Sequence, residues 1–413
     1  MTVGQPGAGE PTLVPRERPT RSARERVEPG PMYEAIIKPV RPFTGIRLTD
    51  DEPGATTEWP PPGPADEALA IEVTQALQAV LDALSADQRD RVSFAADAPE
   101  WQTWLNTHPN VVRQGVLLEE LDGGQRDRVL ALMRASLSER GYQQARDIMR
   151  INGLLVELVR SPEEFGEWPY FLTVFGTPGE GRSWGWQLDG HHLNLNVAVV
   201  GGRVVTTPAF MGSEPTSVTS GPLAGTTVLR AEHRAGLELM QALSADQQAT
   251  ATSHPSILTA DLPEELRHLI NGRTLAGPFA DNVALDHQGV RGADLDGAQR
   301  DLLRAAIGTY LDWSPASNAA VRAALVDEHL DRTSFTWMGA VADRGPFYYR
   351  ILSPVVLVEF DHHAGTVFDV PDPTWQHIHT MVRTPRGGDY GVDLIRRHHQ
   401  QYDHSDGSHR PWS

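Results

Sequence analysis

The residues best suited to chemistry in this chain are histidines, since it has 16 of them and no cysteine. His377 and His379 follow two prolines in a strand-like segment, where alternation places both imidazoles on one face. His191 and His192 form a second pair far away in the sequence. Imidazole nitrogens bind Zn, Fe, Mn and Cu, and such sites need three or four ligands. The sequence therefore predicts one divalent metal site built from His191, His192, His377 and His379, and it does not distinguish these metals.

Two carboxylates and one guanidinium are the predicted catalytic groups. Glu214 or Glu359 could complete the ligand set or move a proton beside the metal. Arg350 follows two tyrosines and could fork onto a substrate carboxylate or phosphate. An ion pair between Arg350 and Glu359 or Asp361 fits the pattern equally well.

A strand pattern runs through residues 184–196 into the apolar run 197–200. Alternation along one strand would place His192, Asn194 and Asn196 on one face and His191, Leu193, Leu195 and Val197 on the other. We expect the polar face to be buried, and a buried polar face needs hydrogen bonds or a metal. The pattern leaves open that His191 and His192 are instead a hydrogen-bonded pair in the core.

Four residues are predicted to contact a substrate. Trp186 and Trp375 would supply an apolar wall that excludes water, while Asn194 and Asn196 would hydrogen-bond its polar groups.

Two helix starts recur in the same order along the chain. The sequence Ala83-Leu-Ser-Ala-Asp-Gln88 returns letter for letter at 242–247, and Leu121-Asp-Gly-Gly-Gln-Arg-Asp127 closely matches 295–301. Each reads as a capping box. Generic helix starts would produce such boxes, but two matched pairs indicate an internal duplication.

We therefore predict an α+β fold in which residues 66–220 and 221–397 are two copies, each a set of helices followed by a small antiparallel sheet. A pseudo-twofold axis would relate the copies. An alignment without a gap sets Glu214 opposite His377.

Composition limits the partners and the ends of the chain. A formal charge of −18 disfavours nucleic acid and anionic membranes, and no apolar run is long enough to span a bilayer. We expect a cytoplasmic protein, with its oligomeric state open. Residues 1–31 are expected to be a disordered tail, 32–65 a strap or linker, and 398–413 a flexible His-rich tail. His362 and His363 are interpreted as a solvated hairpin end.

Several dissimilar motifs in a fixed order resemble the bacterial family catalogued as domain of unknown function 3500. They are Trp186-x-x-x-Gly-His-His-Leu-x-Leu-Asn196, Thr207-Pro-x-Phe-x-Gly-x-x-Pro215, Phe347-Tyr-Tyr-Arg350, Glu359-Phe-Asp361 and His377-Ile-His-Thr with Asp389-Tyr-Gly-x-Asp393. The resemblance covers roughly residues 66–400, and it implies no activity.

The residues themselves favour a metal-dependent enzyme that acts on a small molecule by hydrolysis or oxidation. The sequence has no phosphate-binding glycine loop, no Gly-x-Ser-x-Gly elbow and no His-Glu-x-x-His helix. A second hypothesis is a non-catalytic binding protein whose His and Asn side chains hydrogen-bond a small ligand without a metal.

Overall fold

The computed structural model describes residues 39–49, 65–107, 111–159, 164–179, 183–266 and 272–401. The first part of the described chain contains helices α2 (Glu67–Ala83), α3 (Ala86–Val92), α4 (Gly123–Ser136) and α5 (Glu139–Val159). Its strands are β2 (Ser93–Phe94), β3 (Val116–Leu117), β4 (Tyr170–Phe175), β5 (Trp184–Gly190), β6 (Leu193–Val200), β7 (Arg203–Val205) and β8 (Ala209–Ser213).

The second part follows with helices α6 (Arg230–Ala242), α7 (Ala245–Ala251), α8 (Gly297–Leu311), α9 (Ala316–Glu328) and α10 (Val392–Gln401). Its strands are β9 (Thr252–His254), β11 (Val290–Arg291), β12 (Ser334–Gly339), β13 (Phe347–Leu352), β14 (Leu357–Ala364) and β15 (Pro373–Arg383). A separate parallel pair joins β1 (Arg47–Leu48) to β10 (Ala284–Leu285).

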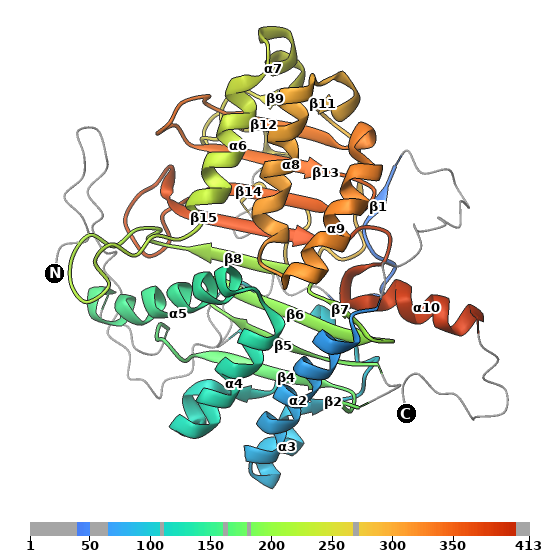
Figure 1. Ribbon diagram of the computed structural model, residues 1–413. Coiled ribbons are helices and arrows are strands. Elements are labelled where there is room, and N and C mark those ends of the chain that lie inside the picture. Colours follow the sequence, from blue (N-terminus) through green and yellow to red (C-terminus); the bar gives the residue numbers. More distant parts are fainter. Residues whose placement is uncertain are drawn as a thin grey trace.

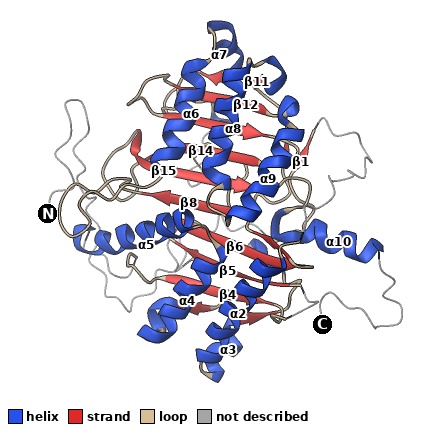
Figure 2. Cartoon of the chain, in the orientation of Figure 1, coloured by secondary structure: helices blue, strands red, loops and turns tan. Residues whose placement is uncertain are grey.

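Within the described residues the main element is one mixed sheet of 13 strands, in the order β11-β12-β13-β14-β15-β8-β6-β5-β4-β2, with β3, β7 and β9 at its sides. Helices α6, α8 and α9 cover one face of the sheet beside β12 to β15, and α2, α4 and α5 cover the same face beside β4 to β8 (Figures 1 and 2). The predicted mixed α+β class is therefore confirmed.

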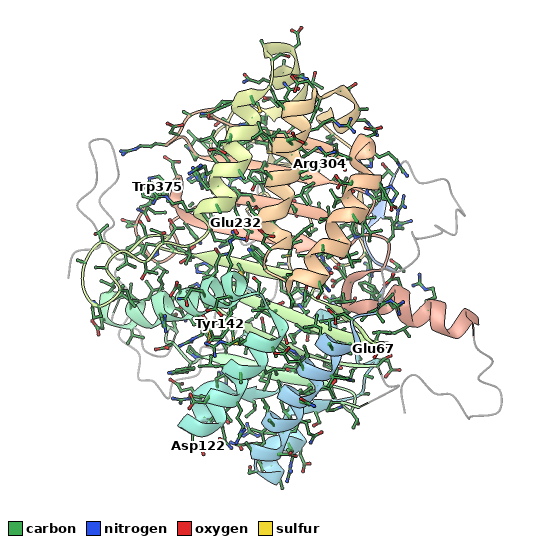
Figure 3. All side chains as sticks on the ribbon, in the orientation of Figure 1. Glu67, Asp122, Tyr142, Glu232, Arg304 and Trp375 are labelled. Carbon is green, nitrogen blue, oxygen red and sulfur yellow. The ribbon has the colours of Figure 1, made fainter. Side chains whose placement is uncertain are left out.

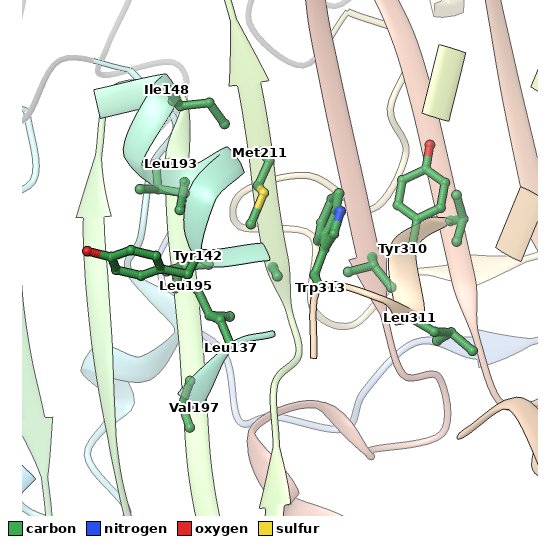
Figure 4. Close-up of a cluster of buried hydrophobic side chains, with 14 of the residues drawn as sticks. Leu137, Tyr142, Ile148, Leu193, Leu195, Val197, Met211, Tyr310, Leu311 and Trp313 are labelled. Carbon is green, nitrogen blue, oxygen red and sulfur yellow. The ribbon is translucent and has the colours of Figure 1, made fainter. Parts of the chain in front are cut away.

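The backbone ladders align one residue from each of ten strands in a continuous row across the sheet. The row is Val116, Leu172, Leu188, Leu195, Ala209, Val382, Val358, Ile351, Phe335 and Val290. All ten belong to the hydrophobic core between sheet and helices. Figure 4 shows how Leu193, Leu195 and Val197 of β6 point into this core together with Tyr142.

The predicted capping boxes form at the expected residues. Asp122 accepts a hydrogen bond from the Gln125 amide at 2.9 Å, and the Gln125 side chain accepts one from the Asp122 amide at 3.0 Å. The Gln125 amide group also donates to Ala83 O at 2.9 Å, while Gln299 makes the matching bond to Ala242 O at 3.0 Å. The recurring motif therefore ties the start of one helix to the end of another in both parts of the chain.

The expected single strand through residues 184–200 is wrong. It is an antiparallel hairpin of β5 and β6, and its turn is made by His191 and His192. His192 adopts a φ of 63°, a conformation that few residues other than glycine adopt. Two histidines are unusual turn residues, so the residue types at 191–192 did not predict that the chain reverses direction there.

Ser213 of β8 pairs with Ile378 of β15, so Glu214, which directly follows β8, lies beside His377. One expectation about β14 needs correction. His362 and His363 lie inside β14 and are buried, with exposed fractions of 0% and 9%, so they are not a solvated hairpin end.

The expectation for residues 1–31 lies outside the described residues, as does most of the 32–65 strap. Of the predicted 398–413 tail, α10 continues to Gln401 and the remainder lies outside the described residues. No helix of the described ranges is long and apolar enough to cross a membrane.

Candidate metal centre

Three histidine side chains converge on the sheet face opposite the helices. The Nε2 atoms of His377 and His379 lie 2.9 Å apart, and those of His192 and His377 lie 3.1 Å apart. One ligand nitrogen from each of the three lies within 4.8 Å of the other two. The side chains are almost fully buried.

Strand β15 carries the rings of His377 and His379, and the turn between β5 and β6 carries that of His192. Alternation along β15 places His377 and His379 on one face. The turn at His192 is fixed by its backbone, because the His192 amide donates to Asn106 O at 3.2 Å and its carbonyl accepts from the Gly212 amide at 2.8 Å. Strand β8 lies between β6 and β15, so the turn reaches across β8 to bring His192 to the β15 histidines.

Gly212 of β8 is the residue that leaves room for the cluster. It pairs with His379 across the ladder. A Cβ at Gly212 would lie 3.1 Å from His379 Cδ2 and 2.9 Å from Ile378 O, which is closer than ordinary packing allows. A side chain here would therefore displace the His379 ring.

The tautomer of His377 follows from its hydrogen bond to the backbone. His377 Nδ1 lies 2.7 Å from Ala364 O, and a carbonyl can only accept, so Nδ1 carries the hydrogen. In the neutral ring Nε2 then presents its lone pair to the cluster. Burial lowers the pKa of His377 to about 4, against a smaller opposing effect of the Ala364 bond. Burial, with the neighbouring imidazoles, also lowers the pKa of His379 well below its ordinary value.

A carboxylate, that of Glu214, lies on the Nδ1 side of the His377 ring. Glu214 Oε2 is 3.3 Å from His377 Nδ1. The same carboxylate accepts backbone hydrogen bonds from Thr366, Val367 and Phe368 at 2.8–3.0 Å. Glu214 therefore anchors the 366–368 loop and borders the imidazole on the side away from the Nε2 atoms.

The other two predicted catalytic residues are engaged elsewhere. Glu359 accepts hydrogen bonds from the Leu275 and Ala276 amides and from the Tyr348 hydroxyl at 2.6–2.9 Å. Arg350 donates to Asp286 O at 3.4 Å and to Gln288 Oε1 at 3.2 Å. Both fasten loops to the sheet, and their contacts do not include the three converging histidines.

His191 packs beside the cluster. Its ring stacks on His192 with centroids 3.9 Å apart, and its Nδ1 lies 2.8 Å from Asn152 Oδ1. Of the four predicted ligands, the structure thus brings three Nε2 atoms together and directs His191 toward α5.

Sequence reasoning missed His363. Its ring is parallel to that of His377, with centroids 4.9 Å apart, and lies 4.7 Å from that of His379. Asp361 pairs with His379 across the ladder, so alternation along β14 places Asp361 and His363 on the face of the cluster. Extending the predicted strand to Ala364 would have found both.

Asp361 is a buried carboxyl group on the same face. Its Oδ2 accepts a 3.3 Å bond from the Arg273 amide, and its Oδ1 has no hydrogen-bond partner within the described ranges. Burial raises the pKa of Asp361 to about 7, although the charge of Arg273 acts in the opposite direction. Gly272, at a φ of 55°, lies so close to Oδ2 that any Cβ there would collide with it.

Asn194 and Asn196 confirm that the polar face is buried, but their amides bond to protein. Asn194 donates to Asp189 at 3.0 Å and accepts from Asn196 at 2.7 Å, while Gln187 donates to Asn196 at 2.7 Å. Burial raises the pKa of Asp189 to about 7, opposed by its bonds to Leu105 and Asn194. This network holds the β5–β6 hairpin that carries His192.

The two predicted tryptophan contacts face different surroundings. Trp186 belongs to the core on the helix side of the sheet. Trp375 lies at the edge of the molecule (Figure 3) and lines a separate cavity of about 230 Å³ with His233 and Arg230. The aromatic ring that does border the cluster is Phe210, whose centroid is 5.2 Å from that of His379.

Comparison with known proteins identifies one family. The family model described as "Protein of unknown function (DUF3500)" matches residues 66–392, which is most of the chain. No curated protein and no solved structure matches it. The chain belongs to the DUF3500 family.

Proposed function

We propose that this protein is a metal-dependent enzyme for a small molecule, with one divalent transition metal held by His192, His377 and His379. The observation that supports this most directly is the convergence of three Nε2 atoms. Those of His379 and His192 lie 2.9 and 3.1 Å from that of His377. In a tetrahedral site with metal–nitrogen bonds of about 2.0–2.1 Å, two ligand nitrogens lie roughly 3.3 Å apart. The cluster is therefore close to the spacing that a metal ion requires.

The ligand set favours catalysis over a purely structural role. Three protein nitrogens leave a fourth position for water or substrate, as in catalytic zinc sites. A metal bound here would polarise a substrate oxygen or lower the pKa of a bound water. Zn, Fe, Mn and Cu all accept such ligands, so hydrolysis and oxidation both remain within the proposal.

The protein's own groups would orient the site and move a proton. Glu214 and Ala364 O fix the His377 ring, which is the usual task of groups hydrogen-bonded to a ligand imidazole. Asp361, with one unbonded oxygen and a pKa near 7, is the carboxyl group best suited to proton transfer at neutral pH. Phe210 packs edge-to-face against His379 and would keep water from that side of the ring.

A non-catalytic binding protein is the alternative, and the same distances support it. Separations of 2.9 and 3.1 Å also suit hydrogen bonds in which His192 and His379 donate to His377 Nε2. The single lone pair of a neutral His377 would then have to accept two donors, which makes this the weaker arrangement.

We also propose that the two parts of the chain are copies of one unit, with the cluster where they meet. The row of ten residues supports this, because Val116, Leu172, Leu188 and Leu195 occur on one side in the same strand order as Val290, Phe335, Ile351 and Val358 on the other. In that register Ala209 corresponds to Val382.

The environment proposed for this enzyme is the cytoplasm, with a small-molecule partner. The net charge of −18 favours a small-molecule partner over nucleic acid, because proteins that bind nucleic acid need a basic surface.

The test is elemental analysis of untagged protein together with His377→Ala and His379→Ala. We expect about one metal per chain in the native protein and almost none in either variant. His254→Ala is the matched control, because His254 lies on β9 and bonds to Ser256 O. Native protein that stays metal-free after incubation with each of the four ions would support the binding protein instead.

A further inference from the structure

A cavity of about 500 Å³ lies beside β7, α9 and the end of β15. Its walls come from the start of α2, from β7, from α9 and from the start of α10. Thr384 is one of the lining residues, and it follows His379 by five positions, roughly 16 Å along an extended chain. The cavity is therefore separate from the histidine cluster, and its volume is that of a small-molecule site.

One face of α9 forms the most informative wall. Asn318, Val321, Arg322 and Leu325 all line the cavity, at the three- and four-residue spacing of one helix face. Val204 and Val205 of β7 add further apolar surface. The cavity thus combines an apolar wall with one guanidinium and one amide from the same helix.

Arg322 carries a charge that the described protein does not neutralise directly. Its Nη2 is shielded from solvent and has no hydrogen-bond partner within the described ranges. The charge that acts on it comes from Asp389, whose carboxylate is already bonded to Arg383 and to the Thr384 amide at 2.8 Å. Burial lowers the pKa of Arg322 to about 10, so it remains charged at neutral pH. Arg322 is partly buried, and its shielded Nη2 lacks a hydrogen-bond acceptor within the described ranges. An anionic ligand in the cavity would supply one.

Asn318 presents an unused acceptor one helical turn away. Its amide nitrogen donates to Val204 O, and its Oδ1 is buried with no hydrogen-bond partner within the described part of the chain. A hydrogen-bond donor on a ligand would satisfy this oxygen.

The acidic side chains of the wall disfavour a ligand with two negative charges. Asp66, Glu67 and Asp393 also line the cavity. Asp66 accepts a hydrogen bond from the Leu69 amide at 3.0 Å and another from Ser317, so it is committed to the start of α2. Arg203 lines the cavity as well, and its Nη1 donates to Gly201 O at 3.2 Å. Three carboxylates against two guanidinium groups would repel a doubly charged phosphate more than a carboxylate.

We propose that this cavity binds a small monocarboxylate with an apolar body, its carboxylate at Arg322 and its body against Val204, Val321 and Leu325. A donor group on the ligand would face Asn318 Oδ1. The site is independent of the proposed metal, so the two proposals can fail separately.

Titration calorimetry with octanoate on the full chain tests this site. We expect saturable binding at one site per chain, and no comparable binding of octan-1-ol, which lacks the carboxylate. Arg322→Leu should weaken octanoate binding about 10- to 100-fold, because charge-assisted hydrogen bonds are lost. Arg304→Gln is the matched control, since Arg304 lies on α8 and pairs with Asp301 and Asp327 at the surface (Figure 3).

Arg322→Gln provides a second variant in case the leucine substitution disturbs α9. It keeps a polar side chain and should show the same loss of affinity. Absence of saturable octanoate binding, equal binding of octan-1-ol, or unchanged affinity in both Arg322 variants would each overturn the proposal.

Discussion

The Nε2 atoms of His192 and His377 lie 3.1 Å apart, although 185 positions separate the two residues. The contact depends on a hairpin turn at a φ of 63°, a central strand with a glycine at its crossing point, and alternation along β15. A non-glycine residue in that backbone region is costly unless the surrounding structure fixes it. Here the bonds to Asn106 O and Gly212 N fix it.

Gly212→Ala should weaken metal binding with little loss of stability elsewhere. The added methyl group would press on His379 Cδ2 and Ile378 O, and misplaced ligands bind metal less tightly. We expect at least about a tenfold rise in the metal dissociation constant, measured by competition with a chromogenic chelator. Gly308→Ala in α8 is the control, because a Cβ there meets no atom within 4 Å. That variant should bind metal normally and be slightly more stable. Equal metal affinity in both variants would contradict the role of Gly212.

Glu214→Gln should weaken both the attachment of the 366–368 loop and the binding of the metal. The amide has one acceptor oxygen where the carboxylate has two, so the 366–368 amides would lose partners. We expect a loss of about 1–3 kcal/mol in unfolding free energy and weaker metal binding. Glu359→Gln is the matched control, since Glu359 also accepts two backbone bonds. It should lower stability similarly and leave the metal in place. Weakened metal binding in both variants would show that general destabilisation is responsible.

His363→Phe should retain the metal, while His363→Ala should lose stability. The His363 ring is parallel to that of His377, a contact that phenylalanine can reproduce and alanine cannot. Bound metal per chain and thermal unfolding of both variants provide the measurement. Loss of metal in the phenylalanine variant would make His363 a fourth ligand.

Asp189→Asn should reduce the dependence of stability on pH. The folded-state pKa of Asp189 is raised to about 7 from an ordinary 3.8. Its favourable contribution is therefore fully present below pH 3.8 and is lost as the pH rises through 7. The difference in unfolding free energy between variant and native protein should shift toward the variant between pH 4 and 8, by a few kcal/mol at most. A difference that is the same at every pH in this range would show that Asp189 does not titrate there.

Local patterns in the sequence predicted much of the fold. The capping boxes at Ser85 and Asp122 formed as expected, since both partners of each box lie within four residues. The pairing of His377 with His379 followed from strand alternation alone. Three of the four predicted ligands also converge. Histidine was the expected ligand type because the chain has no cysteine.

Features set by tertiary contacts could not be predicted. The reversal at His191 and His192 depends on backbone bonds to Asn106 and Gly212, which are distant in the sequence. The anchoring of loops by Glu214 and Glu359 could not be predicted, because their backbone partners at 366–368 and 275–276 are visible only in the folded chain. Trp186 looked like a substrate wall because the hairpin turn, which decides its face, was not foreseen.

The most direct test of the metal centre is a crystal structure of the full chain grown with zinc, with diffraction recorded on both sides of the zinc absorption edge. We expect one anomalous peak, about 2.0–2.1 Å from Nε2 of His192, His377 and His379. Anomalous density confined to other histidines, with these three nitrogens still at hydrogen-bonding distance, would contradict the central claim.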